Sequence, residues 1–98
     1  MNKLRARPKL QNKRVLCIDN NESTAQILKI YCSTTNMYCD IAQDCYTGIE
    51  MSNNMDYDFI IIHASMPIMN GFKIAKVIME KKEIGKIFIS SAGLSIVS

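Results

Sequence analysis

Several polar side chains that could bind a cation or hold a proton lie at the ends of short apolar runs of the sequence. They are Asp19, Asn20, His63, Ser90 and Ser91. The first two follow the run VLCI, His63 follows FIII, and the two serines come directly after KIFI. A carboxylate, an amide, an imidazole and a hydroxyl can work together only if the fold brings the ends of these runs to one place.

The apolar runs alternate with longer mixed segments, which predicts strands separated by helices. The expected strands cover residues 15–18, 38–42, 59–62 and 86–90. Asn20 or Asn21 can cap a first helix, and Asp44 can cap a second helix that runs through Met51. Apolar residues at three- and four-residue spacing predict the faces of the first and third helices: Ile27, Leu28, Tyr31 and Cys32, and then Phe72, Ala75, Ile78 and Met79.

Unbroken apolar strands that alternate with amphipathic helices are typical of a parallel sheet with both faces covered. We therefore predict a doubly wound α/β fold, in which right-handed crossovers place helices on both faces of the sheet. In such sheets the functional loops follow the carboxyl ends of the strands, where the polar residues above are found.

The composition is that of one small globular domain of 98 residues, with 48% hydrophobic and 21% charged residues. This balance excludes a disordered protein, and no apolar run approaches the roughly 20 residues that a membrane span needs. Without a secretory signal, the cysteines predict reduced thiols in the cytoplasm. These are Cys17, Cys32, Cys39 and Cys45, and the last three lack the paired spacing typical of a metal site.

The positive charge is concentrated at the N-terminus. Six of the twelve lysines and arginines lie in residues 1–14, which hold no acidic residue. We expect residues 1–12 to form a basic, flexible tail and residues 13–98 to form the domain. Such a tail can attract nucleic acid, but no recognition helix or interleaved aromatic residues accompany it. Nucleic-acid binding is therefore a minor alternative.

Three blocks of the sequence resemble the response-regulator receiver domain, the phosphoacceptor module of two-component signalling. They are KRVLCIDNNES, YDFIIIHASMPIMNGFKIAKVI and KIFISSAG. In that family an apolar third strand ends in the acceptor aspartate and precedes a Met-Pro-x-Met-Asp-Gly turn. The residues that match this turn are Met66, Pro67, Met69 and Gly71. The resemblance covers residues 13–93 and implies a flavodoxin-like sheet with the strand order 2-1-3-4.

Departures from the family pattern change the chemistry that the resemblance implies. Receivers bind Mg²⁺ through two acidic residues after the first strand and the acceptor aspartate after the third. Here Asp19 fills the first acidic position, Asn20 stands at the second, and His63 stands at the acceptor position. Ser91, or Ser90 in the alternative register, stands at the position of the hydroxyl switch residue. The lysine after the fifth strand has no counterpart, and we expect a fold truncated before the fourth helix and fifth strand.

These departures predict a degenerate receiver that is not an enzyme and holds no metal or cofactor. We expect it to act in signal transduction as a protein-interaction module that works without phosphorylation. Three interpretations of His63 remain open: a structural histidine bonded to Asp19 or to backbone, a pH-sensitive pair with Asp19, and a phosphohistidine or metal ligand. The last of these makes phosphotransfer through His63 the main alternative function.

The truncation predicts that the fourth strand is a sheet edge. Its residues Ile87, Phe88 and Ile89 could then pair with a second copy or with another signalling protein. Met66 and Met69 are a second candidate contact, because methionine adapts to irregular binding surfaces. The face beside the first helix is also expected to lack part of its cover, which Ile96 and Val97 could supply.

Overall fold

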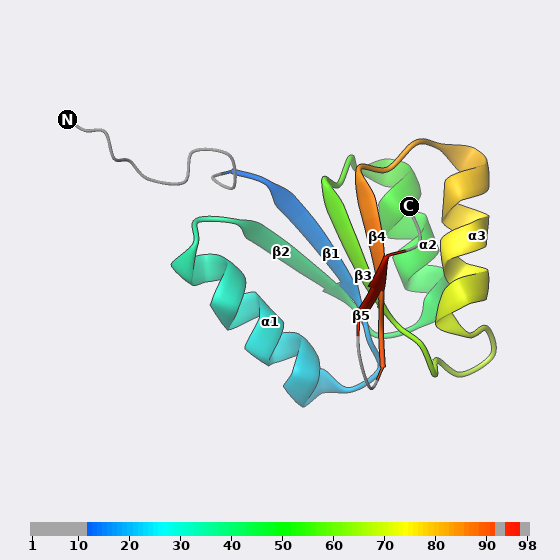
Figure 1. The fold of residues 1–98 in the computed structure, drawn as a ribbon, viewed down its shortest axis with the longest axis horizontal. Coiled ribbons are helices and arrows are strands. Elements are labelled where there is room, and N and C mark those ends of the chain that lie inside the picture. The colour runs from blue at the N-terminus through cyan, green and yellow to red at the C-terminus, as the bar shows by residue number, and fades with distance from the viewer. Residues whose placement is uncertain (1–11, 92–93, 97–98) are drawn as a thin grey trace.

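The computed structural model describes residues 12–91 and 94–96. Strands and helices alternate along the chain from β1 to β4, as the apolar runs predict (Figure 1). The elements are β1 (Arg14–Ile18), α1 (Glu22–Thr34), β2 (Tyr38–Ala42), α2 (Cys45–Asn54), β3 (Phe59–His63), α3 (Gly71–Lys81), β4 (Lys86–Ser90) and β5 (Leu94–Ile96). The predicted tail covers residues 1–12; residues 1–11 lie outside the described part of the chain, and Asn12 is its first described residue.

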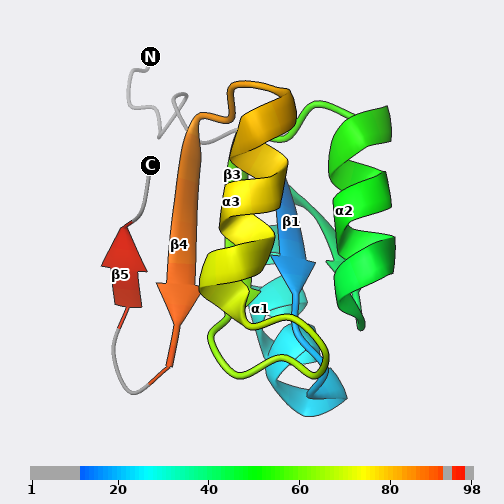
Figure 2. The ribbon, with the colours of Figure 1, turned by 90° about the vertical axis from the view of Figure 1, so that its right-hand side faces the viewer.

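The sheet has the order β2-β1-β3-β4-β5, and its first four strands are parallel. Helix α1 lies on one face, and α2 and α3 lie together on the other (Figures 1 and 2). The prediction of a doubly wound parallel sheet with strands in the order 2-1-3-4 is therefore confirmed. Because all four strands run the same way, their carboxyl ends lie along one edge of the sheet.

The fifth strand was not predicted, and it makes β5 rather than β4 the outermost strand of the sheet. β5 pairs antiparallel with β4, from Phe88 opposite Ile96 to Ser90 opposite Leu94 (Figure 2). It can do so because a short return, unlike a helical crossover, reverses the chain direction. The prediction that β4 is an open edge is therefore wrong along Phe88–Ser90. Ile96 lies on β5 itself, and Val97 lies outside the described residues.

The side chains of β4 also differ from the predicted contact surface. Ile87 and Ile89 are fully buried, because alternate residues of a strand face the same side and these two face α3. Phe88 faces the opposite side of the sheet and is only half-buried. The three residues therefore do not form one exposed patch.

Side-chain caps begin all three helices. Asn21 accepts the backbone N–H of Thr24, and Asp44 accepts that of Thr47 at 2.8 Å. A second hydrogen bond, from the Thr47 hydroxyl, helps to hold the pKa of Asp44 below its ordinary value. The predicted caps are thus confirmed, with Asn21 rather than Asn20 capping α1. Helix α2 continues past Met51 to Asn54.

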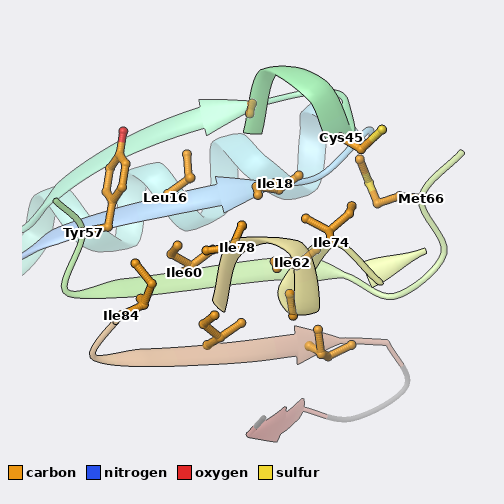
Figure 3. Packing of buried hydrophobic residues seen from close by; sticks show 14 residues of the cluster. Leu16, Ile18, Cys45, Tyr57, Ile60, Ile62, Met66, Ile74, Ile78 and Ile84 are labelled. Carbon is orange, nitrogen blue, oxygen red and sulfur yellow. The ribbon is translucent and has the colours of Figure 1, made fainter. Parts of the chain in front are cut away.

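The main core lies between the sheet and the pair α2 and α3. Aliphatic side chains of β1, β3 and α3 point toward one another there (Figure 3). They include Leu16, Ile18, Ile60, Ile62, Ile74 and Ile78. The predicted face of α3 is correct for Ala75 and Ile78 but wrong for Phe72 and Met79, which are exposed. Ile74 takes their place, because the buried stripe of α3 is turned toward β3.

A smaller cluster under α1 contains three of the cysteines. Cys17, Cys32 and Cys39 are buried with Val15 and Ala25, and all four cysteines of the chain are free thiols. Burial raises the pKa of both Cys17 and Cys39 to about 12. The negative charge of Asp19 adds to the shift at Cys17, and the neighbouring thiols add to it at Cys39.

These shifts predict that the free energy of unfolding falls as the pH rises from about 9 toward 12. In the unfolded chain the thiols lose their protons near the ordinary value of 9.0, whereas in the folded chain they keep them. The unfolded state then binds fewer protons than the folded state, so alkali favours unfolding. Tyr57 acts in the same direction, because burial and its hydrogen bond to Asp40 raise its pKa.

Urea denaturation at a series of pH values measures this loss. A variant with Cys17→Ala and Cys39→Ala should lose less stability per pH unit over the same interval. Equal slopes for the two proteins would show that the thiols do not cause the alkaline loss.

Candidate functional site

The carboxyl edge of the sheet brings the predicted polar residues together. Ile18 pairs with Ile62, so Asp19 and His63 occupy equivalent positions at the ends of β1 and β3. His63 in turn pairs with Ser90, the last residue of β4. Neighbouring strands lie about 4.8 Å apart, so the backbone positions of these three residues form a row. Their roles remain predictions.

Asp19 is held firmly at the start of this row. Its side chain is only 4% exposed, and one carboxylate oxygen, Oδ1, accepts the backbone N–H of Asn21 at 2.9 Å. Its own N–H donates to the carbonyl oxygen of Ala42, which continues the β1–β2 ladder by one residue. A buried carboxylate needs such hydrogen bonds to offset its lost hydration. Asn20, the next residue, is exposed.

His63 ends β3, where the chain turns directly into the loop before α3. Its side chain is half-buried. The loop is tied down by two backbone bonds: Ala64 donates to Ser90, and Gly71 donates to Ala64, both at 2.8 Å. A Cβ atom on Gly71 would lie 2.5 Å from the carbonyl oxygen of His63. Glycine at this position therefore lets α3 begin against the end of β3.

The two serines that were candidates for the switch residue lie in different surroundings. Ser90 lines a hollow of about 340 Å³ together with Asp19. Ser91 follows β4 and is exposed. The role of either serine stays a prediction.

The two methionines proposed as a contact surface are not exposed. Met66 is 7% exposed and belongs to the main core, and Met69 is half-buried and packs against it. The prediction of a contact surface at these residues is therefore wrong for Met66, whose side chain lies beside Cys45 (Figure 3). Between them, Ile68 is exposed and has a φ of 72°, a backbone conformation that branched residues rarely adopt. No pattern in a single sequence signals that conformation.

Comparison with known proteins identifies the family. The family model of the response regulator receiver domain matches residues 15–96, so this chain belongs to the receiver domain family of two-component signalling. The predicted membership of the receiver domain family is therefore confirmed. The match includes both strand ends at which Asp19 and His63 lie.

The sequence relatives are long sensor kinases. The autoinducer 2 sensor kinase/phosphatase LuxQ of Vibrio parahaemolyticus is 29% identical over 72 residues, which are 74% of this chain and 8% of LuxQ. Hybrid signal transduction histidine kinase F of Dictyostelium discoideum is 27% identical over 81 residues, which are 83% of this chain and 7% of the kinase. The chain thus spans less than a tenth of the length of either relative.

Solved structures share the fold. Chemotaxis protein CheY4 of Vibrio cholerae has a TM-score of 0.74 and 21% identity, with 83% of this chain and 72% of CheY4 covered. Response regulator TrrA of Thermotoga maritima, in complex with Mg²⁺ and BeF, has a TM-score of 0.72 and 27% identity. That match covers 76% of this chain and 65% of TrrA.

The residues at the strand ends do not fit the Mg²⁺ ion that the family uses. Mg²⁺ requires near-octahedral oxygen ligands, usually including carboxylates. Here one buried carboxylate, Asp19, already accepts a backbone N–H, and its neighbours are an exposed amide and an imidazole. Within residues 12–91 and 94–96, no group of three or more His, Cys, Asp or Glu side chains is placed to hold a metal ion.

In the same part of the chain, no helix has the length and hydropathy to cross a membrane.

Proposed function

We propose that this chain is a receiver domain that acts as a protein-interaction module without phosphorylation and without catalysis of its own. The observation that carries the proposal is the residue set at the carboxyl edge. One carboxylate, Asp19, stands where a receiver has three. Phosphoryl transfer needs a metal ion to neutralise the charge that develops on the equatorial oxygens. A site with this charge and these ligands holds such an ion poorly.

The nucleophile is also replaced. A carboxylate at the end of β3 can form an acyl phosphate, but the imidazole of His63 cannot. The backbone around His63 is nevertheless held in place, because the hydrogen bonds of Gly71 and Ala64 fix the loop after β3. We infer that the domain presents one fixed conformation to its partner rather than two states that a phosphoryl group selects.

The partner class follows from the family. We propose that the domain binds another signalling protein, where it competes with a phosphorylatable receiver for a kinase or an output domain. Its relatives are sensor kinases by name, which supports this class of partner. The buried free thiols suit the reducing cytoplasm, which we propose as its compartment.

The test is incubation with acetyl phosphate or phosphoramidate in the presence of Mg²⁺, followed by intact-mass spectrometry. TrrA treated in parallel controls for active phosphodonor. We expect no added phosphoryl mass on this chain. A phosphoryl group that both acid and alkali remove would be an acyl phosphate on a carboxyl group such as that of Asp19, and it would refute the proposal.

The alternative function, phosphotransfer through His63, has its own outcome in the same experiment. Phosphohistidine is hydrolysed by acid but survives alkali, so this lability together with loss of labelling in His63→Gln would establish it. It would equally contradict a role without phosphorylation. His63 lies at the end of β3 and its side chain is only half-buried, which this alternative requires.

The basic N-terminus supports nucleic-acid binding less than its charge suggests. Of its six cations, two lie in the described residues, and the fold engages both. Lys13 pairs with Asp58 at 3.9 Å, and Arg14 stacks over the Tyr38 ring at 5.4 Å. The other four lie outside the described residues, so this alternative stays a prediction.

A further inference from the structure

Met55 is exposed to solvent and contacts a cation at the amino edge of the sheet. It caps the C-terminus of α2 and is 41% exposed. Its sulfur, Sδ, accepts a hydrogen bond from Nη1 of Arg14, the first residue of β1, at 3.3 Å. This contact ties the end of α2 to the start of β1. It is weak, because a thioether sulfur is a poor hydrogen-bond acceptor.

The guanidinium of Arg14 can donate more strongly than this sulfur can accept. It carries five N–H donors and keeps its charge. It lies over the ring of Tyr38, 5.4 Å from the ring centre, which restricts its position. The other cation beside Met55, Lys82, already pairs with Asp56 at 3.0 Å. Within residues 12–91 and 94–96, no carboxylate forms an ion pair with Arg14. A stronger acceptor on the Met55 sulfur would therefore meet a charged donor that is already in place.

We propose that Met55 is a site of oxidation by hydroperoxides and that the fold retains its sulfoxide, with Arg14 as the donor to the new oxygen. A lone pair of Sδ attacks one oxygen of hydrogen peroxide, so that an S–O bond forms and the O–O bond breaks. The departing hydroxide takes the proton of the transferred oxygen and leaves as water. The sulfur is oxidised by two electrons, and the peroxide is reduced by the same two.

The sulfoxide strengthens the contact with Arg14. Its oxygen carries partial negative charge, and a hydrogen bond with a charged donor is roughly twice as strong as one between neutral groups. Oxidation of a methionine usually weakens a fold, because it places a polar group among apolar ones. At Met55 that cost is small, because the side chain is exposed. Oxidation therefore tightens the link between α2 and β1, and methionine sulfoxide reductases can reverse it.

Oxidation at Met55 goes beyond the proposed function and does not depend on it. Met55 contacts the start of β1, whereas Asp19 and His63 lie at the carboxyl ends of the strands. The two proposals can therefore fail separately. A chain that takes up no phosphoryl group and is not stabilised by oxidation of Met55 would refute the oxidation proposal alone. A chain that is stabilised in this way but becomes phosphorylated would refute the proposed function alone.

The test compares the full chain carrying Met79→Leu with the full chain carrying Met55→Leu, before and after treatment with hydrogen peroxide. Met79 is the matched control, because it is 40% exposed and, within the described residues, its sulfur accepts no hydrogen bond. Peptide mapping by mass spectrometry locates the added oxygen, and urea denaturation measures the unfolding equilibrium constant. Oxidation of Met55 in Met79→Leu should lower that constant by about threefold or more. Oxidation of Met79 in Met55→Leu should not lower it.

Adding Arg14→Gln to Met79→Leu tests the role of the guanidinium, and in this protein oxidation of Met55 should no longer lower the unfolding constant. Three results would overturn the proposal: no oxygen on Met55 under conditions that oxidise Met79, an unfolding constant that Met55 oxidation leaves unchanged or raises, or an equal decrease with and without Arg14. Circular dichroism establishes that each variant folds. If Arg14→Gln does not fold, the comparison of Met55 with Met79 decides.

Discussion

Restoring the two missing carboxylates, with Asn20→Asp and His63→Asp, is expected to lower the free energy of unfolding in the absence of Mg²⁺. The double variant places two negative charges beside Asp19, which is 4% exposed and keeps little hydration. Like charges at such separations repel one another through a partly screened medium, so we expect a loss on the order of 1 kcal/mol or more. The wild-type chain avoids this repulsion.

Chemical denaturation in the presence of a chelator measures the loss. The matched control keeps Asn20 and carries His63→Asn, which has the shape of the aspartate at that position without its charge. The control separates the loss of the imidazole from the gain of charge. If the double variant were as stable as this control, repulsion at the carboxyl edge would be negligible.

Gly71→Ala is expected to destabilise the fold by about 2 kcal/mol, although alanine ordinarily favours a helix over glycine. The added Cβ would lie 2.5 Å from the carbonyl oxygen of His63 and 3.0 Å from Cα of Ala64. Both atoms belong to the backbone, so no side chain can move aside to relieve the contact. The start of α3 must shift away from the end of β3, which also strains the hydrogen bond from Gly71 to Ala64.

Urea denaturation of Gly71→Ala and of Phe72→Ala compares two adjacent positions of α3. Phe72 is exposed, so its truncation should change the free energy of unfolding by no more than about 0.5 kcal/mol. A Gly71→Ala protein as stable as the wild type would mean that the loop after β3 yields easily. The frame around His63 would then not be rigid.

Local sequence patterns were sufficient to predict most of the strands and helices of the fold. The apolar runs predicted four strands, and the asparagine and aspartate before two helices predicted their caps, because a cap depends on residues three positions apart. The row of Asp19, His63 and Ser90 also followed from the sequence, since parallel strands align their carboxyl ends. These features depend on spacing along the chain.

Features that depend on tertiary contacts were missed. β5 pairs with β4 through backbone groups, so its three residues carry no distinctive pattern. Residues of one helix with similar hydropathy, such as Ile74 and Phe72, could not be ranked for burial without knowing which way α3 is turned. For the same reason, the spacing of Ile27, Leu28, Tyr31 and Cys32 predicted the helix, but the predicted buried face is wrong for Ile27 and Tyr31, which are exposed.

The most direct measurement of the central claim is a calorimetric titration of the wild-type chain with Mg²⁺ in the presence of beryllofluoride, with TrrA as the positive control. That combination is bound in the TrrA structure. We predict no saturable heat from this chain, because Asn20 and His63 supply no negative charge and the imidazole of His63 supplies no oxygen ligand for the ion. Saturable binding of one Mg²⁺ and one beryllofluoride per chain, lost on Asp19→Asn, would contradict the account.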